Sequence, residues 1–195
     1  MPQTHAPDRA RMAALLVIMQ AIFMELLNAS LINVAIPSIK AGFNASPQAA
    51  QWLISGYALG FAVVLPAAGM LADRLGHKRV FLAGLALFTL ASAGCGVASN
   101  MGVLIAARAG QGMGNAMVAP QIMGFLQILF SPTERVSKLP WLGLASGTGA
   151  TLGPLLAGAI IAHQGDGAGW RAVFAMDATG ALITAVCGWF WLPGP

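Results

Sequence analysis

Glu25 and Arg108 are ionisable side chains that fall deep inside long apolar stretches. A charge within a membrane costs at least about 2.5–3.5 kcal/mol, so such a residue usually faces a cavity or a partner. A carboxylate whose proton affinity changes with its access to water and to a nearby cation can carry a proton. The two residues are therefore candidates for proton coupling. A buried structural ion pair is the other interpretation, and the sequence leaves both open. Asp177, near the start of the last apolar stretch, is a further ionisable residue of this kind.

Uncharged polar side chains accompany these two positions. Asn28 shares a helix face with Glu25, and Gln111 and Asn115 share one with Arg108, because residues three or four apart are neighbours on a helix. Polarity and helix position select six residues that we expect to line a substrate cavity: Gln20, Asn28, Asn33, Gln111, Asn115 and Gln121.

Composition indicates the solvent that surrounds these residues. The chain has 195 residues, of which 57% are hydrophobic and 8% are charged. A soluble domain carries about 25% charged residues, so lipid is the expected surrounding for most of this chain. The net charge of +4 is too small and too scattered to favour nucleic-acid binding.

The sequence favours neither an enzyme nor a metal site. It has no phosphate-binding glycine loop, and its two cysteines, Cys95 and Cys187, lie far apart in apolar runs without a metal-ligand spacing. We therefore expect no metal, no cofactor and no catalytic residues. The sequence predicts an all-α membrane protein instead.

Six segments are long enough to cross about 30 Å of hydrocarbon as helices. A short polar tail, residues 1–11, precedes them, and residues 193–195 follow. The segment from Pro37 to Ala50 and the segment opened by Phe130 to Arg135 are expected to be connections. The predicted spans are residues 12–36, 51–71, 80–99, 102–126, 139–162 and 171–192.

The densest charge cluster lies between the second and third spans and orients the chain. It comprises Gly69, Asp73, Arg74, Gly76, Lys78 and Arg79. Most other basic residues fall on the same side of the membrane, and the side rich in Lys and Arg is cytoplasmic. Both termini are therefore expected in the cytoplasm, with the chain in the cytoplasmic (inner) membrane.

A run of small residues occupies the fifth span, from Gly143 to Gly158. Glycines four apart let two helix backbones approach closely, and Pro154 removes one backbone hydrogen bond. The residues singled out here are Gly149, Gly153, Pro154 and Gly158. General membrane packing explains the glycines, but it explains their density beside Pro154 less well.

Together these features resemble the major facilitator superfamily, specifically its fourteen-helix drug:proton antiporters. The segment 69–79 resembles the signature loop between helices two and three, and residues 104–112 resemble the helix-four motif, whose Arg is associated with proton coupling. Residues 149–158 resemble the helix-five antiporter motif, residues 27–37 the helix-one motif, and residues 170–174 the start of helix six. The resemblance implies the six-helix N-terminal half of that fold, built as 3+3 inverted repeats.

The resemblance also implies a function: proton-coupled efflux of lipophilic, drug-like compounds, driven by the proton gradient. One departure is that the helix-one motif normally has Asp where this chain has Asn28, and an amide cannot titrate. We hypothesise that Glu25 takes over the proton-carrying role.

The other departure is that the resemblance ends at Pro195, where the family continues into a second half. The expected partners are the lipid bilayer, a small lipophilic substrate, protons, and the missing half or a second copy. The sequence leaves three interpretations open: an inactive fragment, a pair of identical halves, or a non-transporting partner of a full-length relative.

Overall fold

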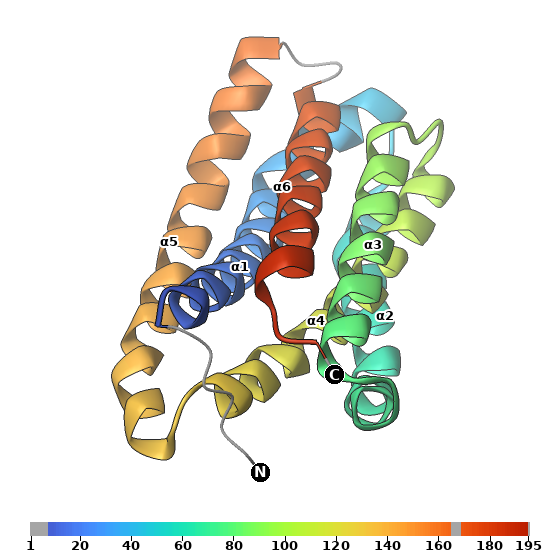
Figure 1. Cartoon of the computed structure of the whole chain (residues 1–195). Coiled ribbons are helices and arrows are strands. Elements are labelled where there is room, and N and C mark those ends of the chain that lie inside the picture. Colours follow the sequence, from blue (N-terminus) through green and yellow to red (C-terminus); the bar gives the residue numbers. More distant parts are fainter. Residues whose placement is uncertain (1–7, 165–168, 195) are drawn as a thin grey trace.

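The computed structural model describes residues 8–164 and 169–194, so residues 1–7 of the predicted tail and Pro195 lie outside the described residues. The described residues form a bundle of six α-helices (Figure 1), which confirms the predicted fold class. The helices are α1 (Asp8–Phe43), α2 (Pro47–Leu75), α3 (His77–Gly96), α4 (Met101–Leu129), α5 (Pro132–Gln164) and α6 (Gly169–Trp191).

Capping residues and a glycine with positive φ mark the boundaries between the first four helices. The Ser46 side chain accepts a hydrogen bond from the Ala49 backbone N–H, and Pro47 occupies the first turn of α2. Gly76 ends α2 with φ 90°, a conformation that favours glycine, and the chain enters α3 at once. The Asn100 side chain caps α4 by accepting from the Val103 N–H at 2.9 Å. The helices can therefore follow one another with few connecting residues.

Parts of two expected connections are helical in the structure. Helix α1 continues through Pro37 to Phe43, and buried Ile39 packs in a cluster with Leu53 and Trp170. Tertiary packing thus outweighs the one backbone hydrogen bond that Pro37 removes. Helix α5 begins at Pro132 within the expected polar loop, because proline is compatible with the first turn of a helix. The membrane boundaries within these helices remain predictions.

The bundle consists of two groups of three helices. Helix α1 packs against α5 and α6, and α4 packs against α2 and α3. Contacts between α3 and α6, and a smaller contact between α1 and α4, join the two groups. Figure 1 shows α1, α5 and α6 on one side of the bundle, with α6 next to α3. The start of α1 and the end of α6 lie at the same end of the bundle, where Ala13 and Trp191 line one cavity.

Glycines allow α4 to approach both of its neighbours. A Cβ atom at Gly112 would clash with the backbone oxygen of Tyr57 on α2. A Cβ atom at Gly114 would lie 2.8 Å from the backbone oxygen of Gly84 on α3. Since both contacts are made to backbone, α4 is held between α2 and α3 at a separation that no larger residue permits.

Five of the six described helices are long and apolar enough to cross a membrane, and α4 is the exception. Helix α4 has 29 residues, enough for a span, but it carries buried Arg108, Gln111, Asn115 and Gln121. Large apolar side chains point outward elsewhere, as Leu90 and Phe190 do. The polar side chains of α4 are thus enclosed by a surface suited to lipid.

Candidate functional site

Arg108 is the centre of a buried polar cluster. Its side chain is 1% exposed. Its Nη1 donates to Asn28 Oδ1 at 3.0 Å and to Gln111 Oε1 at 2.8 Å, and its Nε donates to the Leu53 carbonyl at 3.3 Å. The guanidinium also lies over the Tyr57 ring, 4.6 Å from the centroid. Helices α1, α2 and α4 therefore all contribute to holding one positive charge inside the bundle.

Asp177 of α6 provides the nearest buried negative group in this network. Asn28 Nδ2 donates to Asp177 Oδ2 at 2.6 Å, and the Asp177 side chain is fully buried. Arg108 and Asp177 make no direct ion pair in the part of the chain that the structure describes. Asn28 thus links a buried cation to a buried carboxylate.

A second branch of the cluster runs to α3. Gln111 Nε2 donates to Ser92 Oγ at 2.7 Å, and the Cys95 thiol lies 3.5 Å from Gln111 Oε1. Ser92, Cys95 and Gln111 are all buried. Because Gln111 Oε1 accepts from Arg108, this branch fixes the rotamer of the arginine from the side of α3.

Glu25 occupies the more accessible side of the cluster. Its side chain is half-buried and interacts with the Asn115 side chain. Asn115 Nδ2 in turn donates to the Tyr57 hydroxyl at 2.8 Å. Asn115 and Tyr57 therefore link Glu25 to the Arg108 cluster, and Glu25 and Asp177 lie on different branches of it.

The six residues expected to line a cavity do not form one group. Asn28, Gln111 and Asn115 belong to the Arg108 cluster. Gln20 is half-buried and lines two surface cavities of about 390 and 340 Å³, one between α1 and α6 and the other between α1 and α5. Asn33 is exposed and bonds only the Ala29 carbonyl, on its own helix, among the described residues.

Gln121 lies apart from the cluster, close to the charged loop. Its amide oxygen lies 2.7 Å from His77 Nδ1, and its nitrogen donates to the Ala68 carbonyl at 3.4 Å. It thus joins the end of α2 and the start of α3 to α4.

The charged loop residues divide into free and attached side chains. Asp73, Arg74 and Arg79 are exposed, and nothing lies within 4 Å of a Cβ atom added at Gly69. Lys78 donates to the Leu192 carbonyl at 2.8 Å and lies 5.9 Å from the centroid of the Trp189 ring. The loop therefore holds the end of α6 while presenting its other charges outward.

Part of the small-residue run of α5 packs against α1. Cβ atoms added at Gly149 and Gly153 would clash with the α1 backbone, at Phe23 and Leu27 respectively. Pro154 lies inside α5, and Gly158 has open space around its Cα. Close helix approach, expected of glycines four apart, thus occurs between α5 and α1 within this chain.

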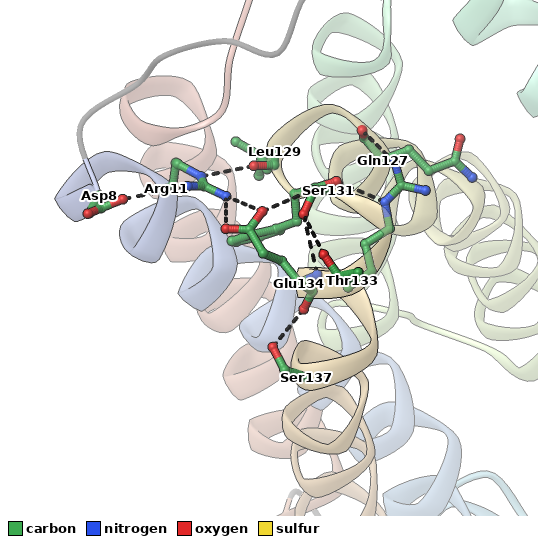
Figure 2. Close-up of polar contacts among 10 residues, drawn as sticks. Asp8, Arg11, Gln127, Leu129, Ser131, Thr133, Glu134 and Ser137 are labelled. Carbon is green, nitrogen blue, oxygen red and sulfur yellow. Dashed lines mark hydrogen bonds and ion pairs between the residues drawn. The ribbon is translucent and has the colours of Figure 1, made fainter.

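A third polar group ties the start of α1 to the connection between α4 and α5 (Figure 2). Arg11 Nη2 donates to both Glu134 carboxylate oxygens, at 2.9 and 2.8 Å, and its Nε donates to the Leu129 carbonyl at 2.9 Å. Glu134 Oε2 also accepts from the Ser131 backbone N–H at 2.8 Å. These bonds, chiefly the one from Ser131 and then the one from Arg11, lower the pKa of Glu134 to about 2. Glu134 precedes the predicted span 139–162, so this contact is predicted to lie at the membrane surface.

Asp177, Tyr57 and Ser92 are members of the Arg108 cluster that were not selected from the sequence as site residues. Asp177 carried a usable signal, because it is a carboxylate within an apolar stretch. Tyr57 and Ser92 carried none, since their types are common in membrane helices and only the packing of α2 and α3 on α4 brings them to Arg108.

Comparison with known proteins agrees with this architecture. The family model described as Major Facilitator Superfamily matches residues 18–195. The chain is 41% identical over 171 residues to the probable actinorhodin transporter of Streptomyces coelicolor, and 35% identical over 179 residues to the multidrug resistance protein Stp of Mycobacterium tuberculosis. These alignments cover 88% and 90% of this chain but only 30% and 32% of the relatives.

Solved structures share the fold at lower identity. A bacterial homologue of the human lysosomal transporter Spinster superposes with a TM-score of 0.85 at 20% identity, covering 97% of this chain and 44% of that one. The proton:xylose symporter XylE gives a TM-score of 0.82 at 17% identity, covering 94% of this chain and 45% of that one. The chain is a multi-pass membrane protein, and it belongs to the major facilitator superfamily.

Proposed function

We propose that this chain is the N-terminal half of an exporter that moves lipophilic, drug-like compounds out of the cytoplasm in exchange for protons. Two of the relatives are named as a transporter of actinorhodin and as a multidrug resistance protein. The chain spans less than a third of the length of these relatives, so the complete transport activity is assigned only by this proposal.

The observation that supports proton coupling is the buried Arg108 cluster. A buried cation is costly unless it is balanced, and two carboxyls, Asp177 and Glu25, lie on separate branches of the network around it. A proton that binds to one carboxyl would change the charge on that branch. Glu25 is the carboxyl on the accessible side, so it is proposed to exchange the proton and, with Arg108, to couple that exchange to transport.

The energy source in this proposal is the proton gradient, without a bound cofactor. The chain lies in the cytoplasmic membrane with both termini in the cytoplasm, as the distribution of Lys and Arg favours. In this proposal, a second half or a second copy of this chain completes the substrate cavity. Apolar and methionine side chains would give a permissive wall for varied lipophilic compounds.

The test is efflux of a lipophilic fluorescent cation from cells that lack their own major pumps. Extrusion that stops when the proton gradient collapses, and that is lost with Arg108→Ala, supports the proposal. Cells in which the chain inserts but dye accumulates as with an empty vector would instead favour an inactive fragment or a non-transporting partner of a full-length relative.

A further inference from the structure

Asp177 is a buried carboxyl to which the proposed exchange at Glu25 assigns no role. Its side chain is fully buried, and Oδ2 accepts one hydrogen bond, from Asn28. Among the described residues, its other oxygen, Oδ1, has no hydrogen-bond partner. An ionised carboxylate in such a place is costly unless it is paired, and binding a proton removes the charge. The setting of Asp177 therefore suits a group that binds and releases a proton.

The donor and acceptor roles of the Asn28 side chain are determined by its partner Arg108. An arginine side chain only donates, so the Asn28 atom that faces Arg108 must be the amide oxygen. The amide nitrogen then faces Asp177 and must donate, so Asp177 Oδ2 accepts. Any proton on Asp177 is consequently carried by Oδ1, the oxygen without a partner. Protonation leaves the bond from Asn28 intact and removes only the negative charge.

The charged and titratable groups that face Asp177 come from the helices around it. Arg108 of α4 supplies the positive charge, while the Tyr57 hydroxyl of α2 and the Cys95 thiol of α3 are the other titratable groups that interact with the carboxylate. Helix α1 contributes the Asn28 amide. The charged residues of α5 lie near its two ends, at Glu134, Arg135, Lys138 and His163. Arg108 is thus the cation that interacts electrostatically with Asp177.

We infer that Asp177 is a second proton-binding site of this protein, and that Asn28 couples its protonation to Arg108. When Asp177 gives its proton to water, the new negative charge draws Arg108 toward the α6 branch through the Asn28 amide. When Asp177 takes a proton back, its negative charge is removed and no longer attracts Arg108 toward the α6 branch. The coupling to transport rests on the proposed function, whereas the proton binding itself does not.

The contact between positions 28 and 177 can be tested by exchanging the two residue types. The amide at Asn28 and the carboxylate at Asp177 are hydrogen-bonded neighbours, so exchanging the two residue types would keep one carboxylate and one amide in the same place.

The experiment uses the complete protein that the gene encodes, reconstituted in lipid, and four variants. Asp177→Asn removes the carboxyl but keeps an oxygen that accepts from Asn28. The double variant Asn28→Asp/Asp177→Asn exchanges the two types. Asp8→Asn, whose carboxylate is 99% exposed, is the matched control for loss of one negative charge, and Glu25→Gln removes the other carboxyl of the network. Infrared spectra recorded across a pH titration report the C=O stretch of protonated carboxyls.

We expect Asp177→Asn to remove one titrating carboxyl band, the double variant to restore a band, and Asp8→Asn to leave the buried bands unchanged. Glu25→Gln should remove a different band. An Asp177→Asn spectrum that titrates like the wild type overturns the inference, as does a C=O band of Asp177 that is absent or unchanged across the whole pH range.

Dye efflux by the same variants separates this inference from the proposed function. Proton-driven efflux that persists in Asp177→Asn overturns the coupling role of Asp177, while the proposed function stands. If the wild-type protein titrates at Asp177 but exports no dye, the proposed function is wrong and the proton-binding site at Asp177 is supported.

Discussion

Asp177 and Arg108 lie in one buried network without touching, because the Asn28 side chain bonds both of them. Asn28 accepts from Arg108 at 3.0 Å and donates to Asp177 at 2.6 Å. An amide between two opposite charges transmits their attraction but keeps them separable, which a direct ion pair would not. The arrangement therefore suits a guanidinium, that of Arg108, whose balancing negative charge at Asp177 can appear and disappear.

The first prediction is that Arg108 and Asp177 are energetically coupled. Arg108→Ala leaves a buried carboxylate without its balancing cation and should destabilise the protein by about 3–5 kcal/mol. In the Asp177→Asn background the same change should cost less, with a coupling energy of about 0.5–3 kcal/mol. Unfolding in mixed micelles, measured for the wild type, both single variants and the double variant, gives this value. Additivity within about 0.5 kcal/mol would show that the two charges do not interact.

The second prediction concerns Glu25, the half-buried carboxyl on the other branch. Glu25→Gln keeps the hydrogen-bonding shape toward Asn115 but cannot release a proton. We expect proton-driven dye export to fall by about tenfold or more, equivalent to about 1.4 kcal/mol or more of coupling. Because the network around Asn28 is untouched, folding and membrane insertion should match the wild type. Unchanged proton-coupled export in Glu25→Gln would remove this residue from the mechanism.

The sequence predicted the six-helix membrane fold, and it singled out Arg108, the residue at the centre of the buried polar cluster, since both depend on strong local signals. Long apolar stretches define the helices, and an arginine within one of them must find partners. The separation of Gln20, Asn33 and Gln121 from Arg108 was not predictable, because helix position says which face a residue occupies but not which helix covers that face.

Helix packing also decided which carboxyl lies nearest to Asn28. Glu25 shares a helix face with Asn28 and was the expected substitute for the missing helix-one carboxylate. Asp177 is 149 positions away in sequence, yet it is the carboxyl that Asn28 bonds. Only the contact of α6 with α1 brings them together, and no spacing along the chain encodes that contact. Whether Glu25 also carries a proton stays a prediction.

The third prediction tests the close approach of α4 to α2. Gly112→Ala would place a methyl group against the Tyr57 backbone oxygen, and backbone cannot move aside as a flexible side chain can. We expect a loss of about 1–3 kcal/mol in unfolding free energy, typical of overpacking, together with weaker proton-driven export because Tyr57 and Arg108 shift. Gly147→Ala on α5 is the matched control, since an added Cβ there meets nothing within 4 Å. That variant should be neutral or slightly stabilising, because alanine favours a helix by about 1 kcal/mol over glycine. Equal effects of the two variants would contradict the packing argument.

The fourth prediction concerns pH and the contact between Arg11 and Glu134, at the start of α1 and of α5 (Figure 2). The pKa of Glu134 is lowered from its ordinary value of 4.5 to about 2, first by the Ser131 backbone N–H and then by Arg11. A lowered carboxyl pKa contributes stability that is fully present above the unfolded value and is lost as the pH falls through the folded value. The contribution should therefore be complete at neutral pH, decline below about pH 4.5 and be absent below about pH 2.

Glu134→Gln tests this directly, because glutamine keeps the size of the side chain and removes its charge. The melting temperature of the variant should lie below that of the wild type at pH 7, and the difference should shrink as the pH is lowered through this window. Thr133→Ala, one position earlier in the same turn, is a control whose difference from the wild type should not depend on pH, since threonine carries no titrating group. A Glu134→Gln difference that stays constant from neutral pH to pH 3 would mean that the charge of Glu134 does not hold α1 to the start of α5. The contact would then act through shape and neutral hydrogen bonds alone.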